Sequence, residues 1–370
     1  MNDASSKPKK EKIFLYVPFL GFDINHHAKD QGGLAESFAS LGYNTCLIIG
    51  GRYGTFNSPG YQVVETGNID KGKSIRGNFR ELFIVMPLFI KSNYNFILMW
   101  NYNRLIPLMA VFLNLQSRFS KKKKKIFLRL DWDGVLVGGS LYKFFYICSL
   151  RLNFLFFNRI ITETPCSFQN ISKMLSNNKE KLALVPCGTM EKNYTNSVNR
   201  KKIILCVARY IRVKGLDVLL RAFYIVHNLE SEWRLKIIGR IDDKLYFEEL
   251  LDFVKNKKMN DCVELSKQLD DLELECAYKE SSIFVLLSYS ESFGLVRAEA
   301  VYYGLPVITT SAGCGSSYGN DPVPYGDPSA AANKILELIR NPKMRNEVAK
   351  MQMQNIKSWK EVVHMLLDLS

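Results

Sequence analysis

Short apolar runs of strand length alternate with longer helical stretches along this chain, and this alternation restricts the possible folds more than any other feature. Glycine or proline commonly lies at the ends of the runs. Strands that alternate with helices predict an α/β fold, with parallel sheets covered by helices on both faces. The predicted strands are residues 12–18, 45–50, 83–87, 96–100, 126–130, 158–162, 182–186, 203–208, 234–239, 263–265, 283–287 and 305–309.

The length of 370 residues is sufficient for two domains of ordinary size. A polar stretch, residues 189–199, separates the strand-like run 182–186 from the next one. We therefore expect a first domain over residues 1–188 and a second over residues 189–354, each built around a parallel sheet.

The net charge of +14 is concentrated in the first half of the chain. Residues 1–186 contain 25 Lys and Arg against 12 Asp and Glu, a net +13, whereas residues 187–370 contain 25 against 24, a net +1. A basic half beside a neutral half predicts that one domain meets an anionic surface or substrate. Nucleic acid is disfavoured as that partner, because no stacking or recognition motif accompanies the charge.

Cysteine usage and the N-terminal residues bear on the compartment. The eight cysteines form no C-x-x-C pair, which is typical of reduced thiols in a cytosolic enzyme and not of a disulfide framework or a zinc site. No small-residue cleavage site follows the first apolar run, so we interpret the first eleven or so residues as a loose tail and not as a secretory signal. These observations predict a cytoplasmic protein.

Two apolar runs, residues 82–90 and 105–113, are each shorter than the roughly 18 residues that span a membrane, and each contains a proline. The lysine run 121–125 and the aromatic-rich segment 141–146 follow them. This region predicts either an apolar surface beside a positive patch, which suits a peripheral enzyme on an anionic cytoplasmic leaflet, or buried elements beside a solvated lysine run. The sequence leaves both interpretations open.

Residues 288–308 carry the most specific chemical signal. Two carboxylates, Glu291 and Glu299, lie eight positions apart around Gly294, between two short strands. A helix that begins after Gly294 directs free backbone N–H groups into the preceding loop, which favours a phosphate there. Carboxylates beside such a phosphate accept hydrogen bonds from sugar hydroxyls. Taken without its flanks, the same pattern is also typical of two solvated glutamates.

With its Ser-Phe-Gly-Leu and the downstream Gly-Leu-Pro-Val-Ile, this segment resembles the E-x7-E motif of retaining glycosyltransferases with the GT-B fold, in particular glycosyltransferase family 4. The resemblance implies two Rossmann-like domains that face each other across a cleft. It implies transfer of a sugar, with retention of configuration, from a nucleotide-diphosphate donor to a hydroxyl of a glycan or lipid-linked acceptor. Cell-surface polysaccharide biosynthesis is the expected setting, and no cofactor or divalent metal is expected.

The resemblance also implies roles in donor binding. The segment from Ala208 to Gly215 is similar to the family's G-R-x-x-x-x-K-G stretch, in which Arg209 and Lys214 would neutralise the diphosphate. Gly239 would end a strand that passes close to the nucleotide. Within the E-x7-E segment, Glu291 would contact the transferred sugar as a catalytic residue, and Glu299 would bind the ribose. The other donor-binding positions are Phe293, Gly294 and Leu295.

In the first domain, the resemblance places Gly32 and Gly33 against the donor phosphates, at the start of a helix. His26 and His27 are candidate acceptor contacts, although adjacent histidines in a polar loop are more often solvated. Asp131 is a candidate catalytic contact to sugar or acceptor, with a loop cap as the alternative. The pattern Asp131-Trp132-Asp133 also resembles the metal site of the other large glycosyltransferase fold. We reject that interpretation because the rest of the chain is GT-B-like.

Three features depart from the family pattern. Ala208 and Cys187 replace a usual glycine and asparagine, and residues 314–319 lack the usual acidic residue. These departures leave open a non-catalytic GT-B-like subunit that binds a glycan or a partner transferase. A GT-B enzyme of another kind, such as an epimerase or an inverting transferase, is a further alternative. The helical stretch 345–369 carries Trp359, and its part 355–370 is expected to pack back on the first domain, as in the family.

Overall fold

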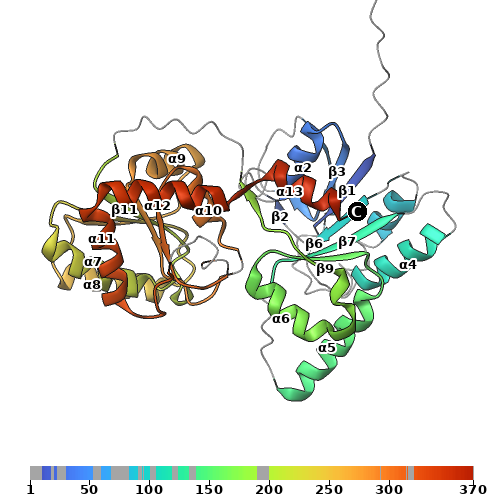
Figure 1. The fold of residues 1–370 in the computed structure, drawn as a ribbon, viewed down its shortest axis with the longest axis horizontal. Coiled ribbons are helices and arrows are strands. Elements are labelled where there is room, and N and C mark those ends of the chain that lie inside the picture. Colours follow the sequence, from blue (N-terminus) through green and yellow to red (C-terminus); the bar gives the residue numbers. More distant parts are fainter. Residues whose placement is uncertain are drawn as a thin grey trace, which may run out of the picture. The chain divides into compact units, whose positions relative to one another are not determined.

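The computed structural model describes residues 11–17, 21–22, 31–52, 60–67, 83–90, 94, 96–100, 106–118, 124–132, 139–189, 200–291, 293–313, 315 and 321–369. The chain forms two compact units (Figure 1). The first unit comprises Met1–Met190 and Ser358–Ser370, and the second comprises Glu191–Lys357.

The first unit is built on a seven-stranded parallel sheet with the strand order β5-β3-β1-β6-β7-β8-β9. The central strands are buried on both faces, which explains their continuous apolar sequences. The strands are β1 (Lys12–Tyr16), β3 (Asn44–Ile49), β5 (Gln62–Glu65), β6 (Phe96–Trp100), β7 (Lys125–Leu130), β8 (Arg159–Thr162) and β9 (Leu182–Leu184). Smaller pieces are β2 (Gly21–Phe22), β4 (Gly51–Arg52), β10 (Gly188–Thr189) and β16 (Lys357–Ser358), which pair as β2-β4 and β10-β16.

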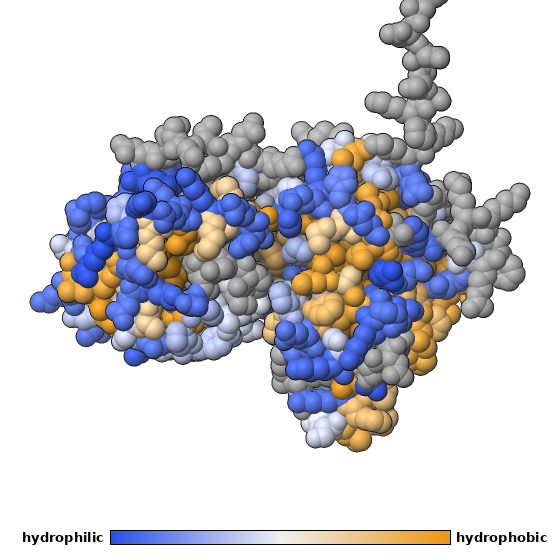
Figure 2. Space-filling view, in the orientation of Figure 1, coloured by the Kyte–Doolittle hydropathy of each residue, from blue (hydrophilic) through white to orange (hydrophobic). Residues whose placement is uncertain are grey.

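One face of this sheet is covered by a layer of helices. The layer consists of a helix over residues 83–90, α4 (Ile106–Arg118), α5 (Ser140–Phe154) and α6 (Pro165–Leu175), followed by the short helix η1 (Ser176–Lys181). Their inner side chains share one apolar core with the strands. Phe14 of β1, for example, packs edge-on against Phe89 and Tyr94, with ring centroids 5.4 and 5.5 Å apart. The outer side of the first unit shows broad apolar areas among the polar ones (Figure 2).

The predicted strand 83–87 is wrong, because residues 83–90 form a helix. Val85 and Phe89 are buried four residues apart, which is the spacing of one helix face. A short apolar run does not by itself distinguish a strand from a buried helix segment. The edge strand β5 was not predicted from the sequence, because its residues are only half-buried or exposed.

The second unit contains a five-stranded parallel sheet with the order β13-β12-β11-β14-β15. Its strands are β11 (Ile203–Val207), β12 (Arg234–Ile238), β13 (Val263–Ser266), β14 (Ile283–Leu286) and β15 (Val307–Thr309). Its helices are η2 (Arg212–Lys214), α7 (Leu216–Leu229), α8 (Lys244–Asn256), α9 (Asp271–Glu280), α10 (Leu295–Tyr302), α11 (Pro328–Arg340) and α12 (Pro342–Asn355). Side chains of Asp243, Asp270, Asp327 and Asn341 cap the starts of α8, α9, α11 and α12.

The predicted single helix over 345–369 is interrupted. α12 ends at Asn355, and α13 (Trp359–Asp368) begins after Ser358. Ser358 and Glu361 form a reciprocal capping box, which starts a new helix. α13 lies against α2 (Gln31–Ser40) and β10 in the first unit.

Candidate functional site

The predicted donor-binding residues of the second unit gather at the carboxyl ends of its parallel strands. Arg209 and Lys214 follow β11, Gly239 follows β12, and Glu291 follows β14. The loops after β11 and β14 lie side by side, since the backbone N–H of Tyr289 donates to the carbonyl of Val213 over 2.8 Å. In open α/β sheets this edge is where ligands bind.

Lys214 and Glu291 form a largely buried ion pair. The Lys214 Nζ lies 2.6 Å from the Glu291 Oε1, and the two side chains are 13% and 8% exposed. The hydroxyl of Ser288 donates to the same carboxylate oxygen over 2.9 Å. An ammonium has three donors, so this pair orients Lys214 and leaves donor capacity for a second anion.

Arg209 occupies a more open position. Its side chain is 53% exposed, and its Nη1 lies 3.1 Å from the Oδ2 of Asp242. Hydrogen bonds from Arg240, and secondarily from Arg209, lower the pKa of Asp242, so this carboxylate stays ionised. An exposed pair of this kind contributes about 0–1 kcal/mol to stability, so a diphosphate can replace the carboxylate at little cost.

Glu299 lies on α10, and a hydrogen bond from Tyr278 orients its carboxylate. The phenolic hydroxyl of Tyr278 donates to the Glu299 Oε2 over 2.9 Å. Burial raises the pKa of Tyr278 well above its ordinary value, so the phenol remains protonated and able to donate. The ring of Tyr278 also stacks on Tyr303, with centroids 5.2 Å apart.

The start of α10 depends on Arg297, a residue that the sequence analysis missed. Arg297 is fully buried and donates to the carbonyls of Phe293 and Ala312 over 2.6 and 2.8 Å. Gly294 has φ +74°, and a Cβ added there would lie 2.7 Å from the Arg297 Nε. The arginine therefore joins the N-terminal loop of α10 to the loop after β15. The signal for it was a cation placed on a helix whose neighbouring positions are apolar.

Two glycines of the second unit are required by close backbone approach. A Cβ on Gly239 would lie 1.8 Å from the carbonyl oxygen of Ala208, so only glycine fits where these two strand ends meet. Gly315 is restricted in the same way by the carbonyl oxygen of Thr310, also at 1.8 Å. Residue 314 and residues 316–319, where the sequence departs from the family pattern, lie outside the described residues.

Residues 189–354 match the family model described as Glycosyl transferases group 1. These residues form a group 1 glycosyltransferase domain.

Similar curated proteins include an uncharacterized glycosyltransferase of Haemophilus influenzae, 32% identical over 107 residues, which are 29% of each chain. The D-inositol 3-phosphate glycosyltransferase of Paenarthrobacter aurescens is 27% identical over 168 residues, covering 42% of this chain and 41% of the relative. The capsular polysaccharide biosynthesis glycosyltransferase CapM of Staphylococcus aureus is 26% identical over 164 residues, covering 43% and 42%. The chain thus spans less than half of the length of these relatives.

Solved structures resemble the whole chain. Sucrose-phosphate synthase of Thermosynechococcus elongatus has a TM-score of 0.74 at 18% identity and covers 97% of this chain and 98% of its own. HepE of Anabaena, in complex with UDP and glucose, has a TM-score of 0.70 at 13% identity and covers 97% and 99%. At this identity the likeness shows the fold, which is GT-B.

Outside the group 1 glycosyltransferase domain, the described site candidates are Gly32, Gly33 and Asp131. Gly32 and Gly33 lie buried in the first turn of α2. A Cβ on Gly33 would lie 2.5 Å from the indole Nε1 of Trp359, and one on Gly188 would lie 2.7 Å from the same ring system. The packing of Trp359 therefore supplies a structural reason for glycine at positions 33 and 188.

Asp131 follows β7 and is exposed, and His26 and His27 lie outside the described residues. A buried ion pair that was not predicted from the sequence lies beside Asp131, with the Arg129 Nε 2.8 Å from the Glu163 Oε1. Arg129 also donates to the Sγ of Cys187 over 3.2 Å, so the cysteine that replaces the family's usual asparagine accepts a hydrogen bond from this arginine. The Arg129 and Glu163 side chains lie at the carboxyl end of the first unit's sheet, the edge where Asp131 was predicted to act.

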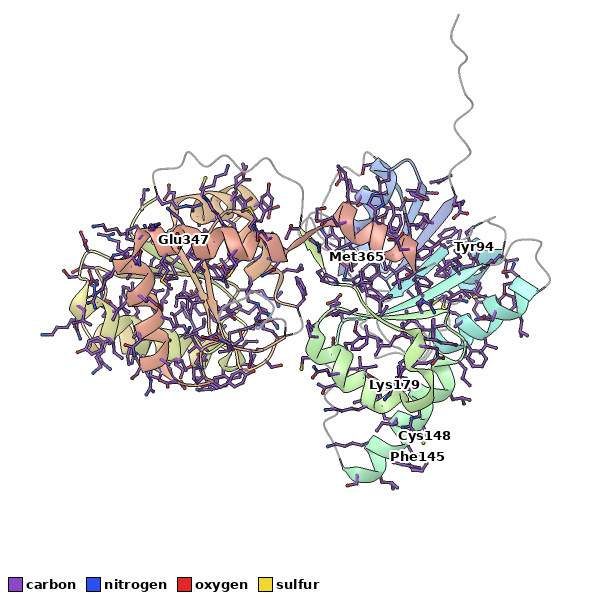
Figure 3. The ribbon with its side chains drawn as sticks, in the orientation of Figure 1. Tyr94, Phe145, Cys148, Lys179, Glu347 and Met365 are labelled. Carbon is purple, nitrogen blue, oxygen red and sulfur yellow. The ribbon has the colours of Figure 1, made fainter. Side chains whose placement is uncertain are left out.

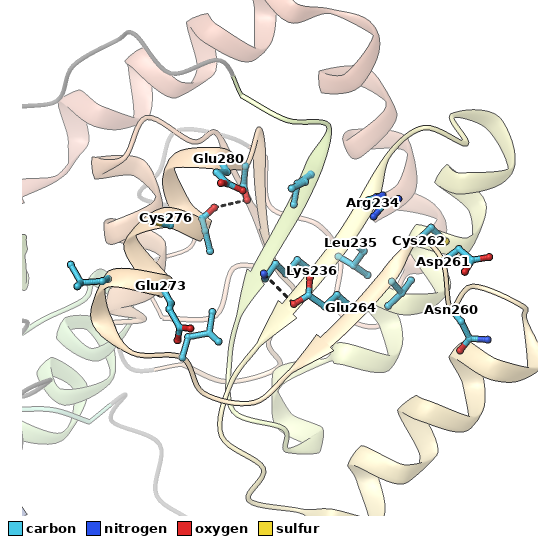
Figure 4. Close-up of a pocket in the computed structure, with 16 residues that line it drawn as sticks. Arg234, Leu235, Lys236, Asn260, Asp261, Cys262, Glu264, Glu273, Cys276 and Glu280 are labelled. Atoms are coloured by element: carbon cyan, nitrogen blue, oxygen red, sulfur yellow. Dashed lines mark hydrogen bonds and ion pairs between the residues drawn. The ribbon is translucent and has the colours of Figure 1, made fainter.

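The glycosyltransferase domain also contains a separate pocket of about 880 Å³ (Figure 4). It lies between α9 and the amino ends of β12 and β13, and its lining includes Arg234, Asp261, Glu273 and the ion pair of Lys236 with Glu264, 3.1 Å apart. None of the predicted site residues lines it. The pocket therefore lies at the amino ends of the strands, whereas Lys214 and Glu291 lie at the carboxyl ends.

Within the described part of the chain, no group of three or more His, Cys, Asp or Glu side chains is arranged to hold a metal ion. The helices described here include none that combines the length and the apolar content needed to cross a membrane.

Proposed function

We propose that this protein is a retaining glycosyltransferase that moves a sugar from a nucleotide-diphosphate donor to a hydroxyl of a glycan or lipid-linked acceptor. The observation that carries the proposal is the ion pair of Lys214 with Glu291, which brings a diphosphate-binding candidate and a sugar-binding candidate together from positions 77 residues apart. The UDP in the solved complex of HepE supports a nucleotide donor, and the name of CapM supports a role in surface polysaccharide biosynthesis.

In the proposed complex the glycosyltransferase domain binds the donor. Arg209 and Lys214 contact the diphosphate, together with the N–H groups at the start of α10, which begins at Leu295 after Gly294 and the buried Phe293. These groups stabilise the negative charge that develops as the bond between the sugar and the diphosphate breaks. In the same complex, Gly239 allows close approach of the nucleotide, Glu299 accepts from the ribose hydroxyls, and Glu291 contacts the transferred sugar.

The first unit supplies the acceptor side of the proposed reaction. Asp131 is exposed at a strand end, where a polar ligand can reach it. His26 and His27 remain proposed acceptor contacts, and Gly32 and Gly33 remain proposed neighbours of the donor phosphates. The acceptor's hydroxyl oxygen forms a bond to the anomeric carbon, the bond between that carbon and the diphosphate oxygen breaks, and the hydroxyl proton passes to the departing nucleoside diphosphate.

A donor-turnover assay tests the proposal. Purified protein is incubated with a panel of nucleotide sugars, and release of the nucleoside diphosphate is followed, with the anomeric configuration of any product determined by NMR. Turnover of one donor with retention is the expected result, and transfer should be unchanged by EDTA because catalysis is proposed to need no divalent metal. A donor bound without any turnover would favour the non-catalytic subunit, and an inverted product would exclude retention.

Arg209→Ala should lower transfer about 100-fold, because one donor to the developing charge is lost. The free energy of unfolding should change by less than about 1 kcal/mol, since the pair with Asp242 is exposed. Initial rates and thermal denaturation are measured on the same preparation. Lys201→Ala is the matched control, because Lys201 forms an exposed pair with Glu280 away from the strand ends that bind donor. Equal loss of rate in both variants would contradict the role of Arg209.

A further inference from the structure

The helix layer of the first unit exposes large apolar side chains to the outside. They come from the helix over 83–90, from α4 and from α5 with the residue that follows it, Leu155, and each of the three helices also buries an opposite side in the core. We call this exposed set the apolar face: Phe83, Ile90, Leu108, Phe112, Leu115, Leu141, Phe144, Phe145, Leu152 and Leu155.

On α5 the exposed apolar residues follow helical spacing. Phe144 and Phe145 lie three and four positions after Leu141, and Leu152 lies seven positions after Phe145, which places the four residues along one side of the helix. Phe144 and Phe145 are 61% and 63% exposed. Because α5 also buries Leu150 and Phe154, it is apolar on two sides. A helix that is apolar all round requires cover on both sides.

The three elements form one continuous surface. The Gln116 side chain on α4 donates to the carbonyl of Ile90 over 3.4 Å, which places α4 beside the helix over 83–90. On its other side, Asn114 of α4 donates to the carbonyl of Phe156, just beyond α5. Figure 2 shows apolar surface over α4 and α5, and Figure 3 shows Phe145 and Cys148 on α5.

Among the described residues, the other helices show no such continuous apolar surface. α6 belongs to the same layer, yet it exposes Gln169 and Lys173. The second unit exposes large apolar side chains at scattered positions, such as Leu245 on α8 and Leu272 on α9, which is normal for a soluble domain.

The charge of this region is predominantly positive. Residues 82–162 contain 12 Lys and Arg against two acidic residues, Asp131 and Asp133, a net +10. Among the described residues, Lys143 and Arg151 lie on α5 itself and Arg118 ends α4. An apolar face bordered by cations and lacking acids is complementary to a bilayer that contains anionic lipids.

We propose that the apolar face, with the cations around it, docks this protein on an anionic lipid bilayer. Phe144, Phe145 and the neighbouring leucines enter the boundary between headgroups and acyl chains, and Arg151, which is exposed on the flank of the same helix, meets the acidic headgroups. The inference deepens the proposed function and rests on it for the lipid-linked acceptor, which such docking would bring within reach. The partner is the bilayer surface, and none of the described helices has the length and apolar content to cross it.

The test is co-sedimentation of the full chain with vesicles of phosphatidylcholine, alone or mixed with phosphatidylglycerol. We expect binding to the mixed vesicles, weaker binding to phosphatidylcholine alone, and a loss of binding as salt increases. The double variant Phe144→Ser/Phe145→Ser should bind the mixed vesicles at least about tenfold more weakly, since two aromatic anchors are removed. The matched control is Leu245→Ser/Leu272→Ser, which removes two side chains that are 72% and 76% exposed on the second unit and should bind as the unaltered protein does.

Cys148, exposed on α5, provides an independent readout. With Cys166, Cys276 and Cys314 replaced by serine, a polarity-sensitive fluorophore on Cys148 should shift to the blue when mixed vesicles are added. Absence of binding, equal binding by the Phe144/Phe145 variant, or equal loss in the control variant would overturn the proposal. A variant that binds vesicles normally but loses self-association in light scattering would assign the face to a second copy of the chain. Donor turnover is measured in parallel, so a failure of the proposed function is seen separately from a failure of docking.

Discussion

Lys214→Ala should lower sugar transfer about 1,000-fold, the largest kinetic effect that we expect from a single substitution in this protein. The substitution removes a cation proposed to lie against the leaving diphosphate, in a site where such a donor contributes most to the rate. It should also destabilise the second unit by about 3 kcal/mol, because the carboxylate of Glu291 would be left unpaired at 8% exposure. Initial rates with saturating donor and thermal denaturation of the same preparation measure the two effects.

A double variant separates catalysis from stability. Lys214→Ala/Glu291→Gln leaves no buried charge at this position, so most of the lost stability should return while transfer remains low. Arg212→Ala is the matched control within the same loop, because Arg212 pairs with Glu249 where both side chains are more than half exposed. Equal transfer by the double variant and by Glu291→Gln alone would show that Lys214 acts only by holding Glu291. Unchanged transfer in Lys214→Ala would remove the proposed phosphate contact.

Trp359→Ala should lower the free energy of unfolding of the first unit by about 4 kcal/mol, which is the usual cost of removing a buried indole. Trp359 is 2% exposed, and its ring lies against the backbone of Gly33 and of Gly188. For a unit of this size the midpoint of thermal denaturation should fall by about 8–16 °C. Differential scanning calorimetry measures the shift.

Gly33→Ala should lower the free energy of unfolding in the unaltered protein but raise it in the Trp359→Ala variant. In the unaltered protein the new Cβ would collide with the indole of Trp359, so the substitution destabilises. In the Trp359→Ala background the space is open, and alanine in the helix α2 should stabilise by about 0.5–1 kcal/mol relative to glycine. If Gly33→Ala destabilised both backgrounds equally, another contact would account for this glycine. If it left both stable but abolished donor turnover, the predicted role beside the phosphates would be favoured instead.

The candidate site of the second unit was largely predictable because its residues lie in local patterns. The N–H groups at the start of α10, the glycine at its N-cap and the two carboxylates around it follow from about ten consecutive residues. Lys214 and Arg209 were likewise found as loop cations between a strand and a helix. The pairing of Lys214 with Glu291 and of Arg209 with Asp242 was not predictable, because the two members of each pair lie on different loops of the sheet edge.

Buried charged residues that contact other loops or strands were not predicted from the sequence. Arg297 appeared as an ordinary cation within a helix, and its burial depends on the loop after β15, which folds over it. Arg129 and Glu163 lie on separate strands, and their pairing requires β7 and β8 to be neighbours. The helix over 83–90 was misassigned because its eight residues are too few to show a period clearly.

The sequence by itself determined the alternation of strands and helices, the positions of the glycines that start and end α10, and the E-x7-E segment, because each depends on contacts between residues close in the chain. Only the tertiary structure decided that Lys214 pairs with Glu291, that Gly33 makes room for Trp359, and that α5 is apolar on its outer side as well as its inner one. These features depend on which strand ends and helix faces meet across long stretches of chain. The alternation of strands and helices does not specify them, because the same local pattern allows many such pairings.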